Sequence, residues 1–575
     1  MINHPSKNLR SAMQKRILLF FIFSIPCFLQ AQEKSTPPPT KITLPSDTTK
    51  AEPTQEKVDV EKPQIELPDV LVIGRDRQVR IAGEKETLRP DSPTLVQPTS
   101  PYEPVSKWLL QDTTKFQASR PGAPATKTTW GGIQVGGYTT IIADVGHWQK
   151  RNSGTFHASG WFDGSAGEFA NTEYSQGGIA AKADYKLAPR LLGSLNGDYS
   201  LFTRGLYRTQ PAEFERAAKT GKLSAKLLYD TEELSSFGLA FDIGAASLAT
   251  DTNNVKLNES KDFWYNIAGD VSARSSGAQW IFSGHYLNES FDATDSTNFQ
   301  TSFGEMGIEI VAPFSKKLIA SAGARYQVAK EDTSSQHSRF SPYGKLSLMP
   351  SPALAFTFHA ITGFEYQTFT EWWRLNPYLA YEIPKPEESD FILKIDGEAT
   401  LAEGLKIHGS FKRSWMGKYL YWERADSLNV IDLKELIDPR LTEVEFGISA
   451  EISKISLDAS FISYADKIPG EAPRSQSDRI PYRPDFRVPV RAAFNPTQDV
   501  HLSLSGNVFG DRPSSLNGTG RLPSFAVFDV NLSKDFSRNI TATATVKNLI
   551  DKDYVIWENF PETGIYVLFG LRAKF

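Results

Sequence analysis

The chain has 575 residues, of which 40% are hydrophobic and 23% are charged, and its net charge at pH 7 is −4. This small charge of mixed sign gives no reason to expect a nucleic-acid partner. Beyond residue 30, no segment approaches the roughly 18 to 20 consecutive apolar residues of a membrane-spanning helix, which excludes a helical membrane protein.

The N-terminus has the pattern of an export signal. Basic residues precede an apolar run from Ile17 to Leu29, and Ala31 ends an acceptable signal-peptidase site. We therefore expect residues 1–31 to be a signal peptide that is cleaved after Ala31. Cys27, the only cysteine, lies inside it, and its neighbours argue against lipid attachment. A mature chain without cysteine excludes disulfides and thiolate metal sites.

A proline-rich stretch follows the signal. Residues 32–66 cannot bury a core, so we expect a disordered periplasmic linker. Residues 67–129 are interpreted as a short plug remnant or a partner-docking segment. Its β-prone start could add a strand to the sheet edge of another protein, or could pair with the interior of its own barrel. The residues expected to dock are Leu67, Asp69, Val70, Leu71, Val72, Ile73 and Gly74.

From Trp130 to Phe575 the composition does not change, and apolar and polar residues alternate with a period of two. The alternation is clear from Val444 to Ile452 and again from Ile455 to Phe461, with a tight reversal between them at Ser453. Alternation of this kind suits a barrel wall between lipid and a wet lumen. The predicted fold is therefore all-β: a transmembrane antiparallel β-barrel over residues 130–575.

Connections alternate between short turns and long polar segments, as in membrane barrels with short periplasmic turns and long external loops. Ten short reversals imply twenty strands; the C-terminal strand adds one, and even parity requires another near residues 110–145. We expect about 22 strands, with 20 to 24 allowed. The reversals lie at 150–152, 187–190, 231–235, 275–277, 313–316, 350–352, 401–404, 453, 496–498 and 535–538.

Aromatic residues near the predicted strand ends favour an interfacial girdle. This reading covers Trp148, Trp161, Phe162, Trp264, Tyr265, Trp280, Trp415 and Trp422. The alternative is a platform at the outer rim on which a sugar or peptide ring could stack. The candidates for such ligand contact are Trp372, Trp373, Tyr421 and Trp422.

The last strand, Ile565 to Phe575, has apolar groups at every odd position and a terminal aromatic residue. Taken alone, it could also be a half-buried strand of a soluble sandwich. Together with the segment from Val546 to Tyr554, which reads Val-Lys-Asn-Leu-Ile-Asp-Lys-Asp-Tyr, it resembles the C-terminal end of TonB-dependent receptors. The match is close over about 30 residues and extends loosely through the barrel pattern.

This resemblance implies a 22-stranded barrel in the outer membrane and recognition of the last strand by the barrel-assembly machinery. The recognition signal would include Tyr566, Gly570, Leu571, Ala573 and Phe575. It also implies that residues 67–74 engage TonB, or another periplasmic protein. One departure is large, because only about 55 residues lie between Arg75 and Trp130, far fewer than the plug domain of the family. Inward loops or another polypeptide would then have to block the lumen.

Enzyme chemistry has little support. The eight histidines are scattered, with no spacing that gathers metal ligands, so no catalytic, cofactor or metal residue is predicted. Five acidic residues should line the lumen as solvated groups, with guidance of a cation or substrate as an alternative: Asp396, Glu398, Glu445, Glu451 and Asp458.

Two hypotheses remain. The first is solute transport across the outer membrane, coupled through residues 67–74, in a barrel surrounded by outer-membrane lipids. The second is a non-transporting scaffold or assembly component, whose periplasmic tail docks a partner protein. An enzymatic barrel, such as an outer-membrane lipase or protease, is a third and weaker reading.

Overall fold

The structure is a computed structural model. It describes residues 127–575, apart from 170, 207–213, 231–234, 253–254, 276, 294–297, 332–334, 380–384, 425–430, 469–478 and 517–519. The predicted signal peptide, the linker and residues 67–74 lie outside the described part. No helix in that part is long and apolar enough to cross a membrane.

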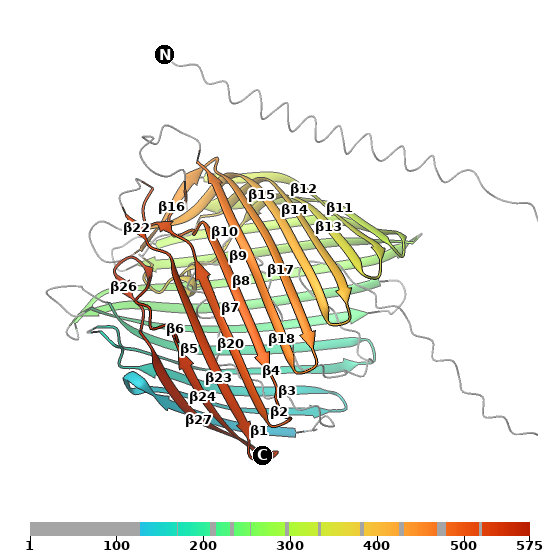
Figure 1. Ribbon diagram of the computed structural model, residues 1–575. Coiled ribbons are helices and arrows are strands. Elements are labelled where there is room, and N and C mark those ends of the chain that lie inside the picture. The colour runs from blue at the N-terminus through green and yellow to red at the C-terminus, as the bar shows by residue number, and fades with distance from the viewer. Residues whose placement is uncertain are drawn as a thin grey trace, which may run out of the picture. The chain divides into compact units, whose positions relative to one another are not determined.

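Twenty-two antiparallel strands form a closed β-barrel (Figure 1). Each wall strand pairs with the next one along the chain, and the ring closes where β1 pairs with β27. The wall strands are β1 (Lys127–Gly136), β2 (Thr140–Arg151), β3 (Gly154–Ser165), β4 (Tyr174–Ala188), β5 (Leu191–Leu206), β6 (Phe214–Asp230), β7 (Ser235–Thr252), β8 (Val255–Ser275), β9 (Ala278–Ala293), β10 (Asn298–Ser315), β11 (Leu318–Glu331), β12 (Ser335–Ser351), β13 (Leu354–Glu365), β14 (Glu387–Ala402), β15 (Leu405–Arg424), β17 (Arg440–Ile452), β18 (Ile455–Lys467), β19 (Phe486–Phe494), β20 (Val500–Phe509), β23 (Phe525–Asp535), β24 (Ile540–Lys547) and β27 (Tyr566–Lys574).

The remaining elements lie between wall strands. They are η2 (Gly137–Thr139), α3 (Phe369–Leu375), β16 (Ile431–Ile437), β21 (Arg512–Pro513), β22 (Arg521–Leu522), β25 (Val555–Trp557) and β26 (Phe560–Pro561). β16 pairs with the outer end of β15, whereas β17 pairs with the rest of that strand. β16 and β17 are therefore two parts of one bent wall segment, interrupted at Asp438, whose φ is 58°.

All ten predicted reversals join consecutive wall strands, and the strand expected near residues 110–145 is β1. The predicted count of about 22 strands is therefore confirmed. The turn at Gly404 shows how the sequence fixes such a reversal. Its φ is +74°, and a Cβ there would collide with the carbonyl oxygen of Glu451, so only glycine fits without strain.

The two faces of the wall differ as the alternation predicts. Phe446 and Phe461 pair across β17 and β18, and 61% and 50% of their surfaces are exposed on the outside of the barrel. Glu445 and Asp458 point the other way, where Glu445 lies 3.7 Å from His408 and Asp458 accepts a hydrogen bond from Ser449. The exposed apolar face suits lipid, and the polar face lines the lumen.

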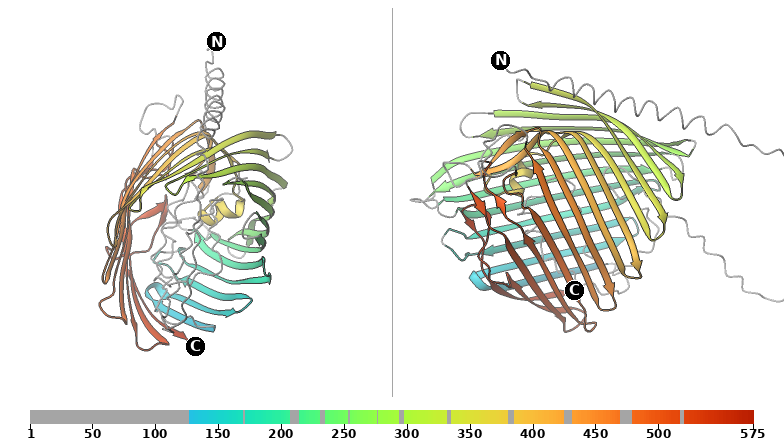
Figure 2. Two further views of the ribbon diagram at one scale, coloured as in Figure 1. Left: turned by 90° about the vertical axis from the view of Figure 1, so that its right-hand side faces the viewer. Right: turned by 45° about the horizontal axis from the view of Figure 1, so that its top comes forward.

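Strand length varies around the ring. β5 to β12 contain 14 to 21 residues each, whereas β24 and β27 contain 8 and 9. The connection from β13 to β14 is long and folds inward, so that α3 lies between the two walls of the barrel (Figure 2, yellow helix). The inward connection places a buried core where the long loops meet.

Candidate functional site

The long connections at one end of the barrel form a single apolar core. We call it the cap and define it by residues 366–379, 419–422, 431–436, 480–482 and 554–560. Its apolar side chains are buried together with side chains of β5, β6, β7 and β9. The cap therefore reaches across the lumen, from the long strands on one side to β15 and the later connections on the other.

The helix of the cap begins with a local sequence signal. The Thr368 side chain accepts a hydrogen bond from the backbone of Glu371, and the Glu371 side chain accepts one from the backbone of Thr368. This reciprocal capping box satisfies amides that a helix start would leave unpaired. The side chains of Phe369, Trp372 and Trp373 on this seven-residue helix are buried.

Two carboxylates of the wall hold the start of this helix. Glu289 on β9 accepts a hydrogen bond of 2.7 Å from the backbone of Phe369. Asp262 on β8 accepts hydrogen bonds of 3.2 Å from the backbone of Thr370 and 2.5 Å from its hydroxyl group. Each carboxyl group accepts a hydrogen bond from a backbone amide that the start of the helix would otherwise leave unpaired, so these two acids are tethers between wall and cap.

Tyr366 adds a third tether just before the helix. Its hydroxyl group donates a hydrogen bond to the Glu289 carboxyl group. The hydroxyl oxygen of Thr301 lies 2.5 Å from the hydroxyl oxygen of Tyr366. Burial raises the pKa of Tyr366 well above its ordinary value, and the negative charge of Glu289 acts in the same direction. The phenol therefore keeps its proton and remains a donor across the ordinary pH range.

The end of the inward connection is held by a buried arginine. Arg216 on β6 is 2% exposed and donates hydrogen bonds to the carbonyl oxygens of Pro377 and Leu379, at 3.0 and 2.7 Å. Beyond this point Leu379 forms an isolated parallel bridge to Ile431, at the start of β16. Arg216 thus fixes the strand-like segment that connects the helix to the other half of the cap.

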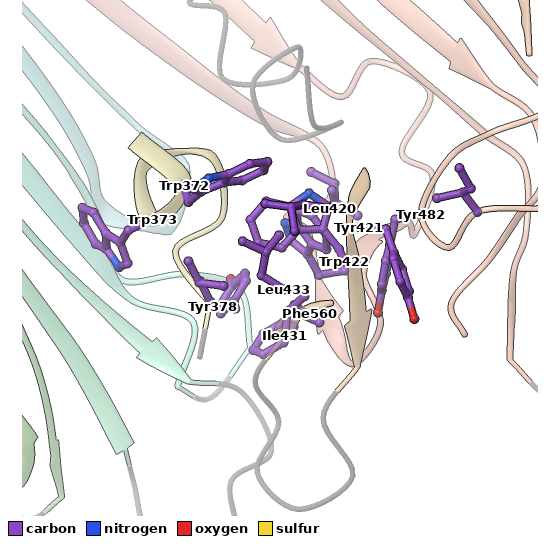
Figure 3. Close-up of a cluster of buried hydrophobic side chains, with 14 of the residues drawn as sticks. Trp372, Trp373, Tyr378, Leu420, Tyr421, Trp422, Ile431, Leu433, Tyr482 and Phe560 are labelled. Atoms are coloured by element: carbon purple, nitrogen blue, oxygen red, sulfur yellow. The ribbon is translucent and has the colours of Figure 1, made fainter. Parts of the chain in front are cut away.

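A chain of aromatic contacts joins the two sides of the cap (Figure 3). Trp422 on β15 contacts Trp372 edge-on at a centroid distance of 5.3 Å, and contacts Trp557 in the same way at 5.7 Å. Tyr482 follows at 4.9 Å from Trp557. Edge-to-face pairs of this kind add to the free energy gained from burying the rings.

The four candidate ligand aromatics all belong to the cap. Trp372, Trp373, Tyr421 and Trp422 are 1%, 6%, 4% and 2% exposed. Their rings pack against other side chains in this arrangement, and ligand contact by them stays a prediction. The indole nitrogens of Trp372, Trp373, Trp422 and Trp557 are buried without a hydrogen-bond partner among the described residues. Such donors cost free energy, which lowers the stability of the packed cap.

Four residues assigned to the interfacial girdle lie elsewhere. Trp422 is in the cap, and Trp264 is 7% exposed inside the barrel, where the Lys222 ammonium group lies 5.2 Å from its ring centroid. That part of the prediction is wrong, because Trp264 alternates with Phe263, which is 47% exposed on the outside, and because the outer end of β15 is buried in the cap.

Trp148 and Trp161 also face the lumen, because Trp161 pairs directly with Asp144, which accepts a hydrogen bond from Arg572 there, and Trp148 lies on the same side of β2 as Asp144. Trp280 is 37% exposed on the outward face of β9.

The predicted barrel-assembly residues all lie on or beside the closing strand. Leu571 and Phe575 are 58% and 82% exposed, and Gly570 pairs with Gln134 and Thr543 on the two neighbouring strands. Recognition of this strand during assembly stays a prediction. Among residues 127–575 as described, no three His, Cys, Asp or Glu side chains are grouped so as to hold a metal ion.

The barrel is similar to solved outer-membrane receptors and transporters. The copper transporter OprC is 13% identical, with a TM-score of 0.62 over 79% of this chain and 81% of that chain. The siderophore receptor PiuA from Acinetobacter baumannii is 10% identical, with a TM-score of 0.60 over 79% and 82%. The FrpB iron transporter from Neisseria meningitidis (F5-1 variant) is 10% identical, with a TM-score of 0.63 over 79% and 83%.

No protein-family model matches the sequence, and no characterised protein matches it in sequence. The structural likeness nevertheless confirms the predicted fold, a closed antiparallel β-barrel of 22 strands like those of these receptors and transporters. The cap is the feature that the sequence reasoning missed as a unit. Its clearest sequence signal is the Thr368-x-x-Glu371 capping box ahead of Trp372 and Trp373.

Proposed function

We propose that the protein transports a solute across the outer membrane, and that the cap is the gate of its outer mouth. The observation that carries this proposal is that inward connections, packed against side chains of the wall, form a buried core across one mouth of a 22-stranded barrel. A barrel of this size is wide enough to pass solutes unless something occludes it. An occluding element made of loops can move while the wall stays intact.

The construction of the cap supports movement. Besides its apolar contacts, the cap is held to the β6–β9 wall by hydrogen bonds that involve only a few wall side chains, among them Arg216, Asp262 and Glu289. The unpaired indole donors lower the free energy needed to unpack the aromatic core. Binding a solute that offers acceptors to these donors would favour the open arrangement, because a ligand shifts an equilibrium by its differential affinity for the two states.

Coupling to the inner membrane belongs to the same proposal. Residues 67–74 would engage TonB, and their deletion should abolish uptake while the barrel still assembles. The test measures accumulation of radioactive ferric enterobactin and of copper in cells that express the protein. These probes are chosen because similar barrels include ferric enterobactin receptors and a copper transporter. Full uptake by the deletion variant would contradict the coupling.

The gate has its own test, a cysteine pair at positions 262 and 370. The side-chain oxygens of Asp262 and Thr370 are 2.5 Å apart, and Cys27 is the only cysteine in the sequence. An oxidised Asp262→Cys/Thr370→Cys barrel should not conduct ions in a planar bilayer, and a reductant should restore openings. Each single substitution is the matched control. Equal conductance before and after reduction would show that the cap is not the gate.

The scaffold function remains the second candidate. It is favoured by the short segment between Arg75 and Trp130, which leaves little chain for a plug. A scaffold should retain a periplasmic protein through purification and lose it when residues 67–74 are deleted. If the barrel purifies without a partner, and cells that express it accumulate solute, the result supports transport over the scaffold function.

A further inference from the structure

Three basic side chains lie close together on the outside of the barrel, at the end that carries the long connections. They are Arg413 on β15, Arg440 on β17 and Lys467 on β18, and we call them the basic row. Arg440 pairs directly with Lys467 on one side and with Trp415 on the other. Arg413 lies two residues along from Trp415, so that all three cations share the outward face.

The basic row borders the apolar band that faces lipid. Val444 and Phe446, which are 45% and 61% exposed, follow Arg440 on the same face of β17. Arg440 lies four residues from Val444, or roughly 13 Å along the strand, and less than this along the membrane normal because barrel strands tilt. This distance puts the cations at the depth of lipid head groups.

Near the basic row, from Arg413 to Trp415, from Arg440 to Phe446 and from Phe461 to Lys467, no acidic residue shares the outward face. Glu443, Glu445 and Asp466 alternate along their strands with the outward-facing residues and therefore lie on the lumenal side. There, Asp466 lies 3.5 Å from Arg483. Arg440 and Lys467 are exposed and form no ion pair with any residue that the structure describes.

Arg413 is oriented by its neighbours. Its guanidinium group donates to the hydroxyl oxygen of Thr442 at 3.2 Å and lies 5.2 Å from the ring centroid of Trp415. Trp415 in turn contacts Phe391 at 5.5 Å. Planar guanidinium groups bind phosphate with paired hydrogen bonds, and aromatic rings favour the interface between lipid tails and head groups.

We propose that the basic row binds a phosphate-bearing lipid in the leaflet on the side of the long connections. Its phosphate would lie against Arg413, Arg440 and Lys467, and its acyl chains would cover the apolar band beside Val444 and Phe446. The occupant is identified by charge complementarity and by continuity with the lipid-facing surface. This binding does not depend on transport, because it involves only the outer face of the wall.

The test compares lipid retention by folded barrels. Wild-type protein is reconstituted into phosphatidylcholine vesicles containing lipid A, extracted in mild detergent, and assayed for lipid A by native mass spectrometry. The test variant is Arg440→Gln/Lys467→Gln, because both side chains are exposed and neither forms an ion pair with another described residue. The matched control is Lys330→Gln, an exposed outward lysine near the corresponding end of β11.

Wild type and the Lys330→Gln variant should retain lipid A equally, and the double variant should retain roughly tenfold less, since each cation near a charged lipid surface contributes measurably. Folding is checked by heat-modifiable gel mobility, which all three proteins should share. Equal retention by the double variant would overturn the proposal. So would equal retention of a dephosphorylated lipid A by wild type, which would show that only the acyl chains are bound.

Discussion

Arg216 on β6 donates a buried hydrogen bond of 2.7 Å to the carbonyl oxygen of Leu379, a residue 163 positions later in the chain. The same nitrogen lies 3.0 Å from the carbonyl oxygen of Pro377. One side chain of the wall therefore holds two backbone acceptors of the inward connection. Without the Arg216 guanidinium group, the two carbonyl oxygens would be buried against the wall and would lose these hydrogen bonds.

Replacing Arg216 with alanine should destabilise the cap and leave the barrel assembled. Loss of charged hydrogen bonds to buried acceptors costs about 3 kcal/mol, which corresponds to roughly a hundredfold shift toward the open form. Planar-bilayer recordings should show this as a rise in open time. Arg190→Ala, at an exposed periplasmic turn, is the control. If both variants were as closed as wild type, Arg216 would not be a tether.

Substitutions of Trp422 should separate packing from hydrogen bonding. Trp422→Ala removes a ring that contacts both Trp372 and Trp557, and truncation of a buried tryptophan costs about 3 to 5 kcal/mol. Trp422→Phe keeps an aromatic ring and removes an indole donor that has no partner in the described residues, so most of the cost should disappear. Bilayer conductance should be high for the alanine variant and near wild type for the phenylalanine variant.

The opposite order for these two variants, or no effect of either, would contradict an aromatic core that holds the cap closed. Heat-modifiable gel mobility checks that both barrels are folded before conductance is compared.

The closed cap should weaken in alkaline solution because of Tyr366. Its pKa is raised in the closed form above the ordinary value of 10.0, so the protonated hydroxyl favours closure fully below pH 10. That contribution is lost as the pH rises through the raised pKa. Conductance of the wild type should therefore increase above pH 10.

The Tyr366→Phe variant lacks the hydroxyl group and should already conduct more than wild type at neutral pH. Its conductance should lack the alkaline increase that Tyr366 causes. An identical alkaline increase in both proteins would assign the effect to another group.

Two turn glycines make a matched pair for assembly. Gly404 and Gly277 both have positive φ angles, 74° and 80°, but only at Gly404 would a Cβ collide with a backbone carbonyl. Gly277→Ala should therefore cost only the left-handed strain, about 1 kcal/mol, whereas Gly404→Ala adds a steric clash. Urea titration of the folded band on gels should give a clearly lower midpoint for Gly404→Ala. Equal midpoints would show that the turn relaxes around the added methyl group.

The wall could be predicted from the sequence because each strand has one lipid face and one wet face. Because of this constraint, apolar and polar residues alternate with a period of two, as from Val444 to Ile452. The turns at one end of the strands are short and can be recognised in the sequence. The number of strands then follows from the number of turns. The last strand supplied the parity that located β1.

The cap could not be predicted in the same way, because its contacts join residues far apart in the sequence. Trp372 and Trp557 come from two connections and Trp422 comes from the wall strand β15, and no local period relates them. Read singly, an aromatic residue near a strand end fits an interfacial girdle, which is why Trp422 was assigned there. The tethers Arg216, Asp262 and Glu289 likewise look like ordinary lumenal charges until their backbone partners are known.

The pairing of β1 with β27 also constrains when the molecule can be completed. The backbone of Thr129 exchanges two hydrogen bonds with that of Phe575, so the C-terminal residue itself closes the ring. The ring closes only once β27 is present, because β1 pairs with it from Trp130 and Lys574 to Gly136 and Leu568. A precursor without β27 would leave the edges of β1 and β24 open in the membrane, where the hydrocarbon offers no hydrogen-bond partner to their backbone groups.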